Sequence, residues 1–289
     1  MANAIDPNFL ALTAIITILY QGLFFAIAAT FKFDKVTDFA GSTNFVLLAF
    51  LTAVINGTWF TRQIVLTLLV FVWGTRLAAF LLIRILKWGE DRRFDDKRNN
   101  LGAFAIFWIM QAAWVWTVSL PVTIANASDM DPPLEARDAI GWFLWICGIV
   151  IEMTSDYQKL KFKEDMDNRD KWCDIGFWSV SRHPNYFGEM LLWWGIFAAA
   201  SPVFRGGQWA AIFGPLFLMA ILLFLSGLPL LEASADKKYG SNPAYRMYKE
   251  TTSPLIPFPP TKYAQLPPWV KKTFFFEFPI YSKHLGVVD

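Results

Sequence analysis

Residues 176–200 read GFWSVSRHPNYFGEMLLWWGIFAAA, and this stretch indicates the class of fold. It passes from a polar, charged end into an apolar run, and it carries His183, one of only two histidines in the chain. Pro184 suits the first position of a helix, because its φ is preset and its missing N–H would have no helical partner. Ser181 or His183 is placed to cap that helix. The sequence therefore predicts a helix that starts at Pro184 and enters an apolar environment.

The first turns of this helix gather polar side chains on one face. Asn185 and Glu189 are four residues apart, and Tyr186 and Glu189 are three apart, so all three share a face. Arg182 and His183 lie at its mouth. The free N–H groups of a helix start, its positive dipole end and a cationic arginine together favour an anion. We expect a phosphate site here.

The composition is that of an integral membrane protein. Of the 289 residues, 55% are hydrophobic and only 17% are charged, and the apolar residues cluster in runs separated by charged loops. Such runs predict an all-α membrane protein. A net charge of +2, with basic residues dispersed among acidic ones, excludes a nucleic-acid partner. Seven segments approach spanning length, at about 9–30, 44–59, 64–85, 103–125, 139–153, 184–200 and 209–231.

The reactive residues exclude two further classes of site. Two cysteines, Cys147 and Cys173, are too few for a disulfide framework, and neither a C-x-x-C nor an H-E-x-x-H spacing occurs, so we expect no metal. The first eight residues contain no basic residue, and no small-residue cleavage site follows the first apolar run. We therefore expect that run to be a retained span and not a signal peptide.

The distribution of basic residues predicts the topology. With the N-terminus outside, 22 of the 26 Lys and Arg residues fall in inner loops and three in outer loops, and Arg76 lies within a span. This positive-inside pattern places the C-terminus in the cytosol. The long hydrophilic stretches fall on the same side, so we expect an active cytosolic face, in a bacterial inner membrane or an endoplasmic-reticulum-like one. We expect one membrane domain, 1–258, and an aromatic, Pro-rich cytosolic tail, 259–289, that lies on the membrane surface or against a protein partner.

For two sets of charged residues, the sequence allows both a structural role and a ligand-binding role. Arg76 lies within a span, where an unpaired cation would cost several kcal/mol; it either forms a structural ion pair or contacts a ligand. Asp156, Lys159 and Lys163 share one face if the fifth segment continues as a helix. They form either a simple charge ladder, which the residues alone favour, or a cationic cradle for phosphates in which Asp156 binds a ribose or an amide.

Five stretches together resemble the steroid 5-alpha-reductase family, in particular its bacterial branch of unknown function, DUF1295. They occur in the family's order and cover roughly residues 70 to 258, and the set is specific although each motif alone is weak. The stretches are Arg76-Leu77, then Gly89-Glu90-Asp91 with Arg93-Phe94, then Ser155-Asp156-Tyr157-Gln158-Lys159, then Gly176 to Glu189, and finally Tyr245 and Tyr248 with Leu255-Ile256-Pro257.

The resemblance implies a seven-helix membrane reductase that holds NADPH between its helices and cytosolic loops. The reaction would be hydride transfer to the carbon–carbon double bond of a lipophilic enone, steroid-like or another lipid, with the hard step carried by the cofactor. In this reading the basic residues bind phosphates, and Asn185 and Glu189 bind the nicotinamide amide. The implied cofactor contacts are Arg76, Asp156, Lys163, Arg182, His183, Asn185, Tyr186, Glu189, Tyr245 and Tyr248.

The chain departs from the family pattern where the family places its catalytic residues. Trp73 occupies the position at which the steroid reductases carry a tyrosine, three residues before the arginine of the third span. An indole N–H donates a hydrogen bond but does not give up a proton. The second span, 44–59, contains no carboxylate. The catalytic residue therefore stays unassigned, with Arg76 and Glu189 as candidates.

Two other functions fit part of the same evidence. Membrane methyltransferases of the isoprenylcysteine carboxyl type also carry an Arg-His-Pro-x-Tyr-x-Gly stretch that enters a helix, and they bind S-adenosylmethionine. The third interpretation is a lipid-binding or assembly subunit without catalysis, which Trp73 and the aromatic tail support. Ligand binding by the purified protein separates these readings.

Overall fold

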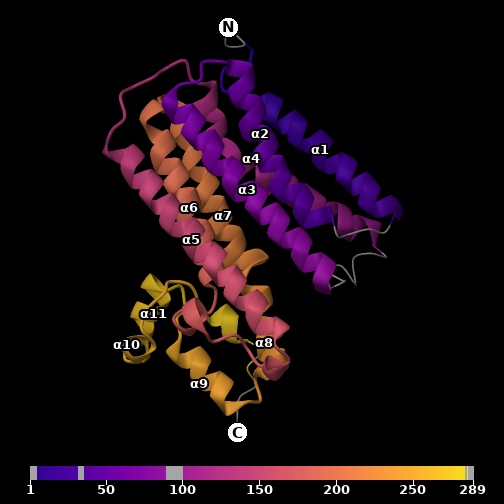
Figure 1. Ribbon diagram of the computed structural model, residues 1–289, viewed down its shortest axis with the longest axis vertical. Helices are drawn as coiled ribbons and strands as arrows, with labels where there is room; N and C mark the ends of the chain where they lie inside the picture. The colour runs from indigo at the N-terminus through magenta and orange to yellow at the C-terminus, as the bar shows by residue number, and fades with distance from the viewer. Residues whose placement is uncertain (1–4, 32–35, 89–99, 284, 286–289) are drawn as a thin grey trace. The chain divides into compact units, whose positions relative to one another are not determined.

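The computed structural model describes residues 5–31, 36–88, 100–283 and 285, and within these ranges every regular element is a helix. The predicted all-α class is therefore confirmed. The motif Gly89-Glu90-Asp91 with Arg93-Phe94 lies outside the described residues, as do Lys32 and Lys35, two of the basic residues counted in the inner loops. The α-helices are α1 (Leu10–Phe31), α2 (Thr37–Asn56), α3 (Thr61–Trp88), α4 (Leu101–Ala127), α5 (Ala136–Glu164), α6 (Pro184–Ala200), α7 (Phe213–Ala220), α8 (Leu228–Tyr239), α9 (Pro243–Thr251), α10 (Pro260–Ala264) and α11 (Pro268–Phe274) (Figure 1).

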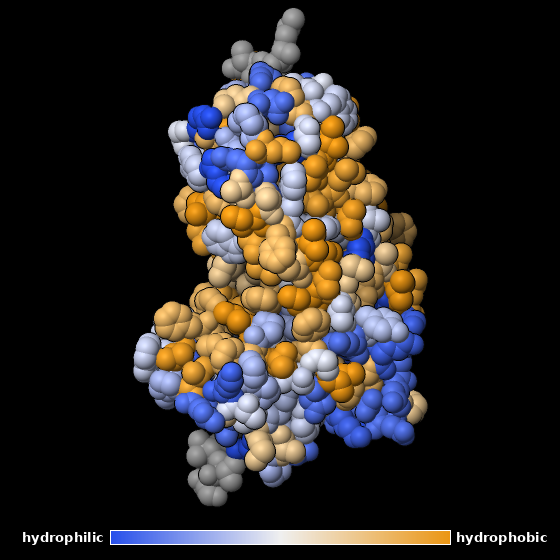
Figure 2. Space-filling model, turned by 60° about the vertical axis from the view of Figure 1, so that its left-hand side comes forward, coloured by the Kyte–Doolittle hydropathy of each residue, from blue (hydrophilic) through white to orange (hydrophobic). Residues whose placement is uncertain are grey.

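Among the described residues, six helices are long and apolar enough to cross a membrane, which confirms the membrane class. They are Leu10–Phe31, Thr37–Asn56, Thr61–Lys87, Leu101–Ala127, Ala136–Glu164 and Gly206–Tyr239. The sixth predicted segment, 184–200, corresponds to α6, which is not among these six helices; its 17 residues extend about 25 Å at 1.5 Å per residue. That length is at the lower limit for a span. Large apolar side chains are exposed on these helices, and Figure 2 shows such side chains in orange over one face of the molecule.

The last of these spans is not one regular helix. It starts as a 3-10 helix, Gly206–Ile212, continues as α7 and then as a π-helical turn, Ile221–Leu225, and bends at Ser226 and Gly227 before α8. A break of this kind frees backbone carbonyls that must be satisfied in an apolar environment. The carbonyl of Leu223 accepts a hydrogen bond of 2.8 Å from the hydroxyl of Tyr281. The C-terminal segment therefore satisfies part of this break.

The chain divides into two compact units. Unit 1 comprises Met1–Trp145 and Trp193–Phe217, and unit 2 comprises Ile146–Leu192 and Leu218–Asp289. The division expected from the sequence, a membrane domain to residue 258 and a separate tail, stays a prediction. The described residues of that tail belong to unit 2.

Unit 1 has an aromatic core and a set of neutral polar links between its helices. The Trp73 ring meets those of Phe45 and Trp193 edge-on at 5.3 and 5.1 Å, and Trp73 is fully buried. The Gln21 amide donates to Asn44 Oδ1 at 3.0 Å and accepts from Gln111 at 2.9 Å. Such amides join helices where lipid supplies no partner. Among the described residues of this unit, the fully buried charged pair is Arg62–Asp138, at 2.7 Å.

Glycines bring α5 and α6 into close contact in each unit. A Cβ on Gly141 would lie 2.5 Å from the carbonyl oxygen of Gly195 in unit 1, and one on Gly148 would lie 2.6 Å from that of Gly188 in unit 2. No side chain fits at such distances, so these glycines let the two backbones touch. The start of α6, where the sequence predicts a site, is thereby held directly against α5.

Candidate functional site

The start of α6 lies in unit 2, beside the segment that follows α9. The helix begins at Pro184, as predicted, and the Ser181 hydroxyl accepts the backbone N–H of His183 at 3.2 Å. The same hydroxyl donates to the Leu255 carbonyl at 2.7 Å, and the Arg182 N–H donates to the Ser253 carbonyl at 2.8 Å. Two of the motifs that carry the resemblance, around residues 176–189 and 255–257, are therefore joined by a hydrogen bond from the Ser181 side chain, with a backbone bond beside it.

A second set of contacts joins these motifs to α5, which continues past the predicted segment 139–153 to Glu164. The Trp178 indole N–H donates to the Ser155 carbonyl at 2.8 Å, and Gln158 Oε1 accepts the Phe177 N–H at 2.9 Å. The Lys159 ammonium lies 4.0 Å from the centre of the Trp178 ring. Asp156, on the same helix, is buried, whereas Lys163 in the last turn is exposed. Three of the five sequence motifs thus meet in unit 2.

Arg182 is buried, and protein oxygens use every nitrogen of its guanidinium. Its Nε donates to Glu232 Oε1 at 3.0 Å, and its Nη1 donates to the carbonyls of Lys249 and Thr252 at 2.6 and 2.9 Å. Nη1 and Nη2 also form a fork on the carboxylate of Glu277, at 3.1 and 2.8 Å. The predicted phosphate contact of Arg182 stays a prediction, and in this arrangement Nη1 and Nη2 are bonded to a carboxylate of the chain itself.

Lys249 forms the second cationic centre of the same cluster. Its Nζ lies 2.6 and 2.8 Å from the two carboxylate oxygens of Asp236 and 2.9 Å from Glu232 Oε2. It also donates to the Tyr281 carbonyl at 2.6 Å. Tyr245, a predicted cofactor contact, donates its hydroxyl to Asp236 at 3.0 Å. Buried charges require such pairing, because removal from water costs several kcal/mol per ion.

His183 is the least satisfied member of the cluster. Its Nε2 lies 2.7 Å from Glu232 Oε1, while its Nδ1 is buried without a hydrogen-bond partner among the described residues. Its ring stacks on that of Tyr186, with centroids 5.9 Å apart. Burial lowers the pKa of the imidazole, and the bond to Glu232 opposes this effect only in part. Because Nε2–H faces a carboxylate, the neutral ring presents Nδ1 as an acceptor.

Asn185, two residues after His183, also has a polar atom without a hydrogen-bond partner in the described part of the chain. Its Oδ1 is buried and has no partner among the described residues. Buried polar atoms in native proteins are nearly always paired. Two buried acceptors at the start of α6, His183 Nδ1 and Asn185 Oδ1, therefore have no donor among the described residues.

The remaining predicted residues are divided between the units. Tyr248 donates its hydroxyl to the Trp178 carbonyl at 2.7 Å, and Glu189 lies on α6 one residue after the close contact at Gly188. Arg76 and Trp73 belong to α3 in unit 1. The Arg76 guanidinium lies 5.4 Å from the centre of the Phe80 ring.

The sequence analysis missed four charged members of the cluster. They are Glu232, Asp236, Lys249 and Glu277. A signal was present for two of them, because Glu232 and Asp236 stand four residues apart directly after an apolar run and so share a helix face. Glu277 lies 95 residues from Arg182, and no local pattern connects the two.

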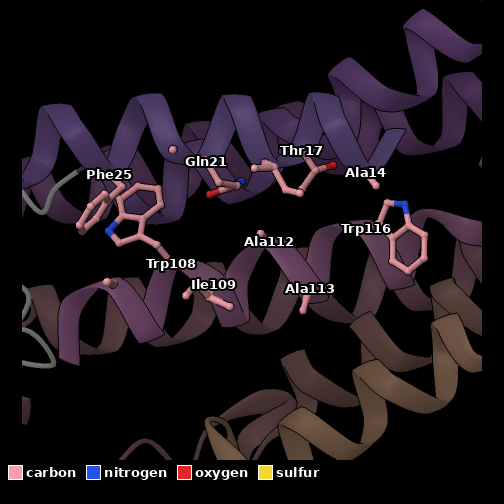
Figure 3. Close-up of a pocket in the computed structure, with 12 residues that line it drawn as sticks. Ala14, Thr17, Gln21, Phe25, Trp108, Ile109, Ala112, Ala113 and Trp116 are labelled. Atoms are coloured by element: carbon pink, nitrogen blue, oxygen red, sulfur yellow. The ribbon is translucent and has the colours of Figure 1, made fainter. Parts of the chain in front are cut away.

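Unit 1 contains a separate apolar groove between α1 and α4, with a volume of about 590 Å³ (Figure 3). Phe25 and Trp108 line it toward one end and Trp116 toward the other, with small residues such as Ala112 between them. The Oγ1 of Thr17 and the Nε1 of Trp108 are buried without a hydrogen-bond partner among the described residues. The size and lining are those of a site for a small lipophilic molecule.

A comparison with models of protein families gives one match to this chain. Residues 24–252, well over half of the chain, match the family model described as "Protein of unknown function (DUF1295)". No curated protein and no solved structure matches the chain. The suspected DUF1295 resemblance is therefore confirmed, whereas the wider link to the steroid 5-alpha-reductases stays a prediction. This chain belongs to the DUF1295 family.

Proposed function

We propose that this protein is a membrane-embedded, NADPH-dependent reductase of the carbon–carbon double bond in a lipophilic enone. The observation that carries the proposal is the pair of unsatisfied acceptors at the start of α6, His183 Nδ1 just before the helix and Asn185 Oδ1 in its first turn. A buried acceptor left without a donor costs about 1–3 kcal/mol. The carboxamide N–H groups and ribose hydroxyls of a nicotinamide nucleotide are donors of the required kind.

The surrounding residues have complementary roles in this proposal. Asn185 and Glu189 would orient the carboxamide from α6, and Asp156 on α5 would bind a ribose hydroxyl. Lys159 and Lys163 on α5 would attract the phosphates. The cofactor supplies the hydride when it is bound. The protein's part is to bind it, orient it and exclude water from the reacting atoms.

The proton donor is not the residue that the family pattern suggests. Trp73 is fully buried between Phe45 and Trp193, and an indole does not release a proton. Arg76 and Glu189 stay the candidates for polarising the carbonyl of the substrate. A donor aimed at the developing enolate oxygen contributes about 10²–10³ in rate. The groove between α1 and α4 supports a lipophilic substrate.

A ligand panel on the purified full chain in lipid nanodiscs tests the proposal. NADPH, NADH and S-adenosylmethionine are each titrated while the unfolding temperature is measured. We expect saturable stabilisation by NADPH, because a ligand that binds the folded state alone raises its stability with concentration. Stabilisation by S-adenosylmethionine alone would contradict the reductase proposal and favour a methyltransferase. Stabilisation by none of the three would favour a lipid-binding or assembly subunit.

A further inference from the structure

The C-terminal segment, residues 254–283, is bonded to the centre of the charged cluster in unit 2. Glu277 receives a two-pronged hydrogen bond from Arg182, with Nη1–Oε2 at 3.1 Å and Nη2–Oε1 at 2.8 Å. This fork is the geometry with which arginine binds either a carboxylate or a phosphate. The Arg182 fork is therefore an anion site, and the chain itself supplies the anion.

Glu277 is held in this position from its own segment. The Tyr263 hydroxyl donates to Glu277 Oε2 at 2.8 Å, and the Glu277 N–H donates to the Lys271 carbonyl at 3.1 Å. The preceding residue, Phe276, has a φ of 61°, a left-handed conformation that is uncommon for a bulky side chain. A local turn that is unfavourable by itself thus presents the carboxylate to Arg182.

The two sides of the fork differ in their access to solvent. The Arg182 side chain is 4% exposed, whereas that of Glu277 is 24% exposed. The other partners of Arg182 are a buried carboxylate, Glu232, and backbone carbonyls. A dissolved anion can therefore replace Glu277 more readily than any other partner. Glu277 also lies beyond residue 252, where the family match ends.

We propose that a phosphate-bearing ligand exchanges with Glu277 on Arg182, so that the C-terminal segment closes this anion site until the ligand binds. The identity of that ligand as NADPH rests on the proposed function, whereas the exchange itself does not. A site that is filled by an internal group for most of the time binds its ligand more weakly, in proportion to the fraction that is open. Removing the carboxylate must then strengthen binding.

The test compares the wild type with three variants of the full chain in nanodiscs. Glu277→Gln removes the charge but keeps the shape, and we expect NADPH to bind it about 10-fold more tightly, because a neutral amide competes less well than a carboxylate for arginine. Tyr263→Phe removes one bond that positions Glu277, and a smaller gain of the same sign is expected. Glu250→Gln is the matched control, since Glu250 is exposed on α9. We expect this variant to bind NADPH with the affinity of the wild type. Equal or weaker binding by a folded Glu277→Gln protein overturns the proposal.

A second measurement follows the segment itself. Amide hydrogen exchange in the C-terminal segment, residues 254–283, of the wild type rises on addition of NADPH if the ligand displaces Glu277. Unchanged exchange at saturating NADPH contradicts the displacement. If neither the wild type nor Glu277→Gln binds NADPH, the proposed function fails by itself. The anion site is then judged with inorganic pyrophosphate, which must bind Glu277→Gln more tightly than the wild type or this proposal fails as well.

Discussion

The two units of this protein bury polar groups in different ways. In unit 1 most buried polar side chains are neutral amides and hydroxyls, such as Asn126, which donates to the Ala49 carbonyl, Thr52 and Thr67 at 3.0 to 3.1 Å. In unit 2 about half of them are charged, and Arg182 and Lys249 both contact Glu232. Neutral links between helices contribute little each and are replaceable, whereas buried charges are costly and persist only when paired. The difference means that charge changes should affect unit 2 more strongly than unit 1, and the proposed cofactor contacts on α5 and α6 belong to unit 2.

The largest effect is expected at the centre of the charged cluster. Replacing Arg182 with Ala leaves the Glu232 carboxylate, which is 3% exposed, without its arginine, and this should lower the free energy of unfolding by about 3–5 kcal/mol. Thermal unfolding in nanodiscs measures the change. Arg169→Ala, at an exposed position in the same unit, is the control. If the two variants unfold alike, the cluster is not the stabilising centre of unit 2.

A smaller effect is expected in the aromatic core of unit 1. Trp73→Tyr restores the residue of the steroid reductases, but it places a smaller ring and a new hydroxyl in a fully buried position. The loss of packing and the cost of the hydroxyl should lower stability by about 2 kcal/mol. We expect no gain in enone reduction, measured as NADPH oxidation with a lipophilic enone. A clear gain in turnover would show that position 73 reaches the substrate.

The hydrogen bonds between neutral side chains of unit 1 should contribute still less to the free energy of unfolding. Asn126→Ala removes three hydrogen bonds between helices, yet we expect a loss of only about 1 kcal/mol, as is typical of such bonds in membrane proteins. Thr75→Ala, at an exposed position on α3, provides the baseline for the same unfolding measurement. A loss as large as that of Arg182→Ala would remove the contrast between the units.

The smallest effect is a dependence on pH. Burial lowers the pKa of His183 below its ordinary value of 6.5, so the unfolded chain binds this proton more readily than the folded one. The stability that His183 contributes is then present above about pH 6.5 and is lost as the pH falls below it. Unfolding temperatures of the wild type and His183→Gln, measured from pH 5 to 8, should converge on the acid side. If the difference in unfolding temperature between the two proteins widens as the pH falls, the pKa of His183 is raised in the folded protein and this account is wrong.

The sequence was sufficient to predict what depends on local pattern. Composition and apolar runs predicted the helical membrane class, and Pro184 predicted the start of α6. The partners of Arg182 were not predictable, since Glu232 and Glu277 lie 50 and 95 residues away and helical periodicity relates only neighbours within a few residues. The uniform apolar run at 209–231 likewise concealed a π-helical turn, although Ser226-Gly227 marked the bend that follows it.

The unsatisfied acceptors at the start of α6, His183 Nδ1 and Asn185 Oδ1, provide the most direct test of the central claim. Binding of NADPH to the full chain in nanodiscs is measured by titration calorimetry for the wild type and for Asn185→Ala, which removes one of those acceptors. We predict saturable binding by the wild type and about 10-fold weaker binding by a folded Asn185→Ala protein, the equivalent of one lost hydrogen bond of about 1.4 kcal/mol. The absence of binding to the wild type, or equal affinity of the two proteins, would contradict a nicotinamide site at the start of α6.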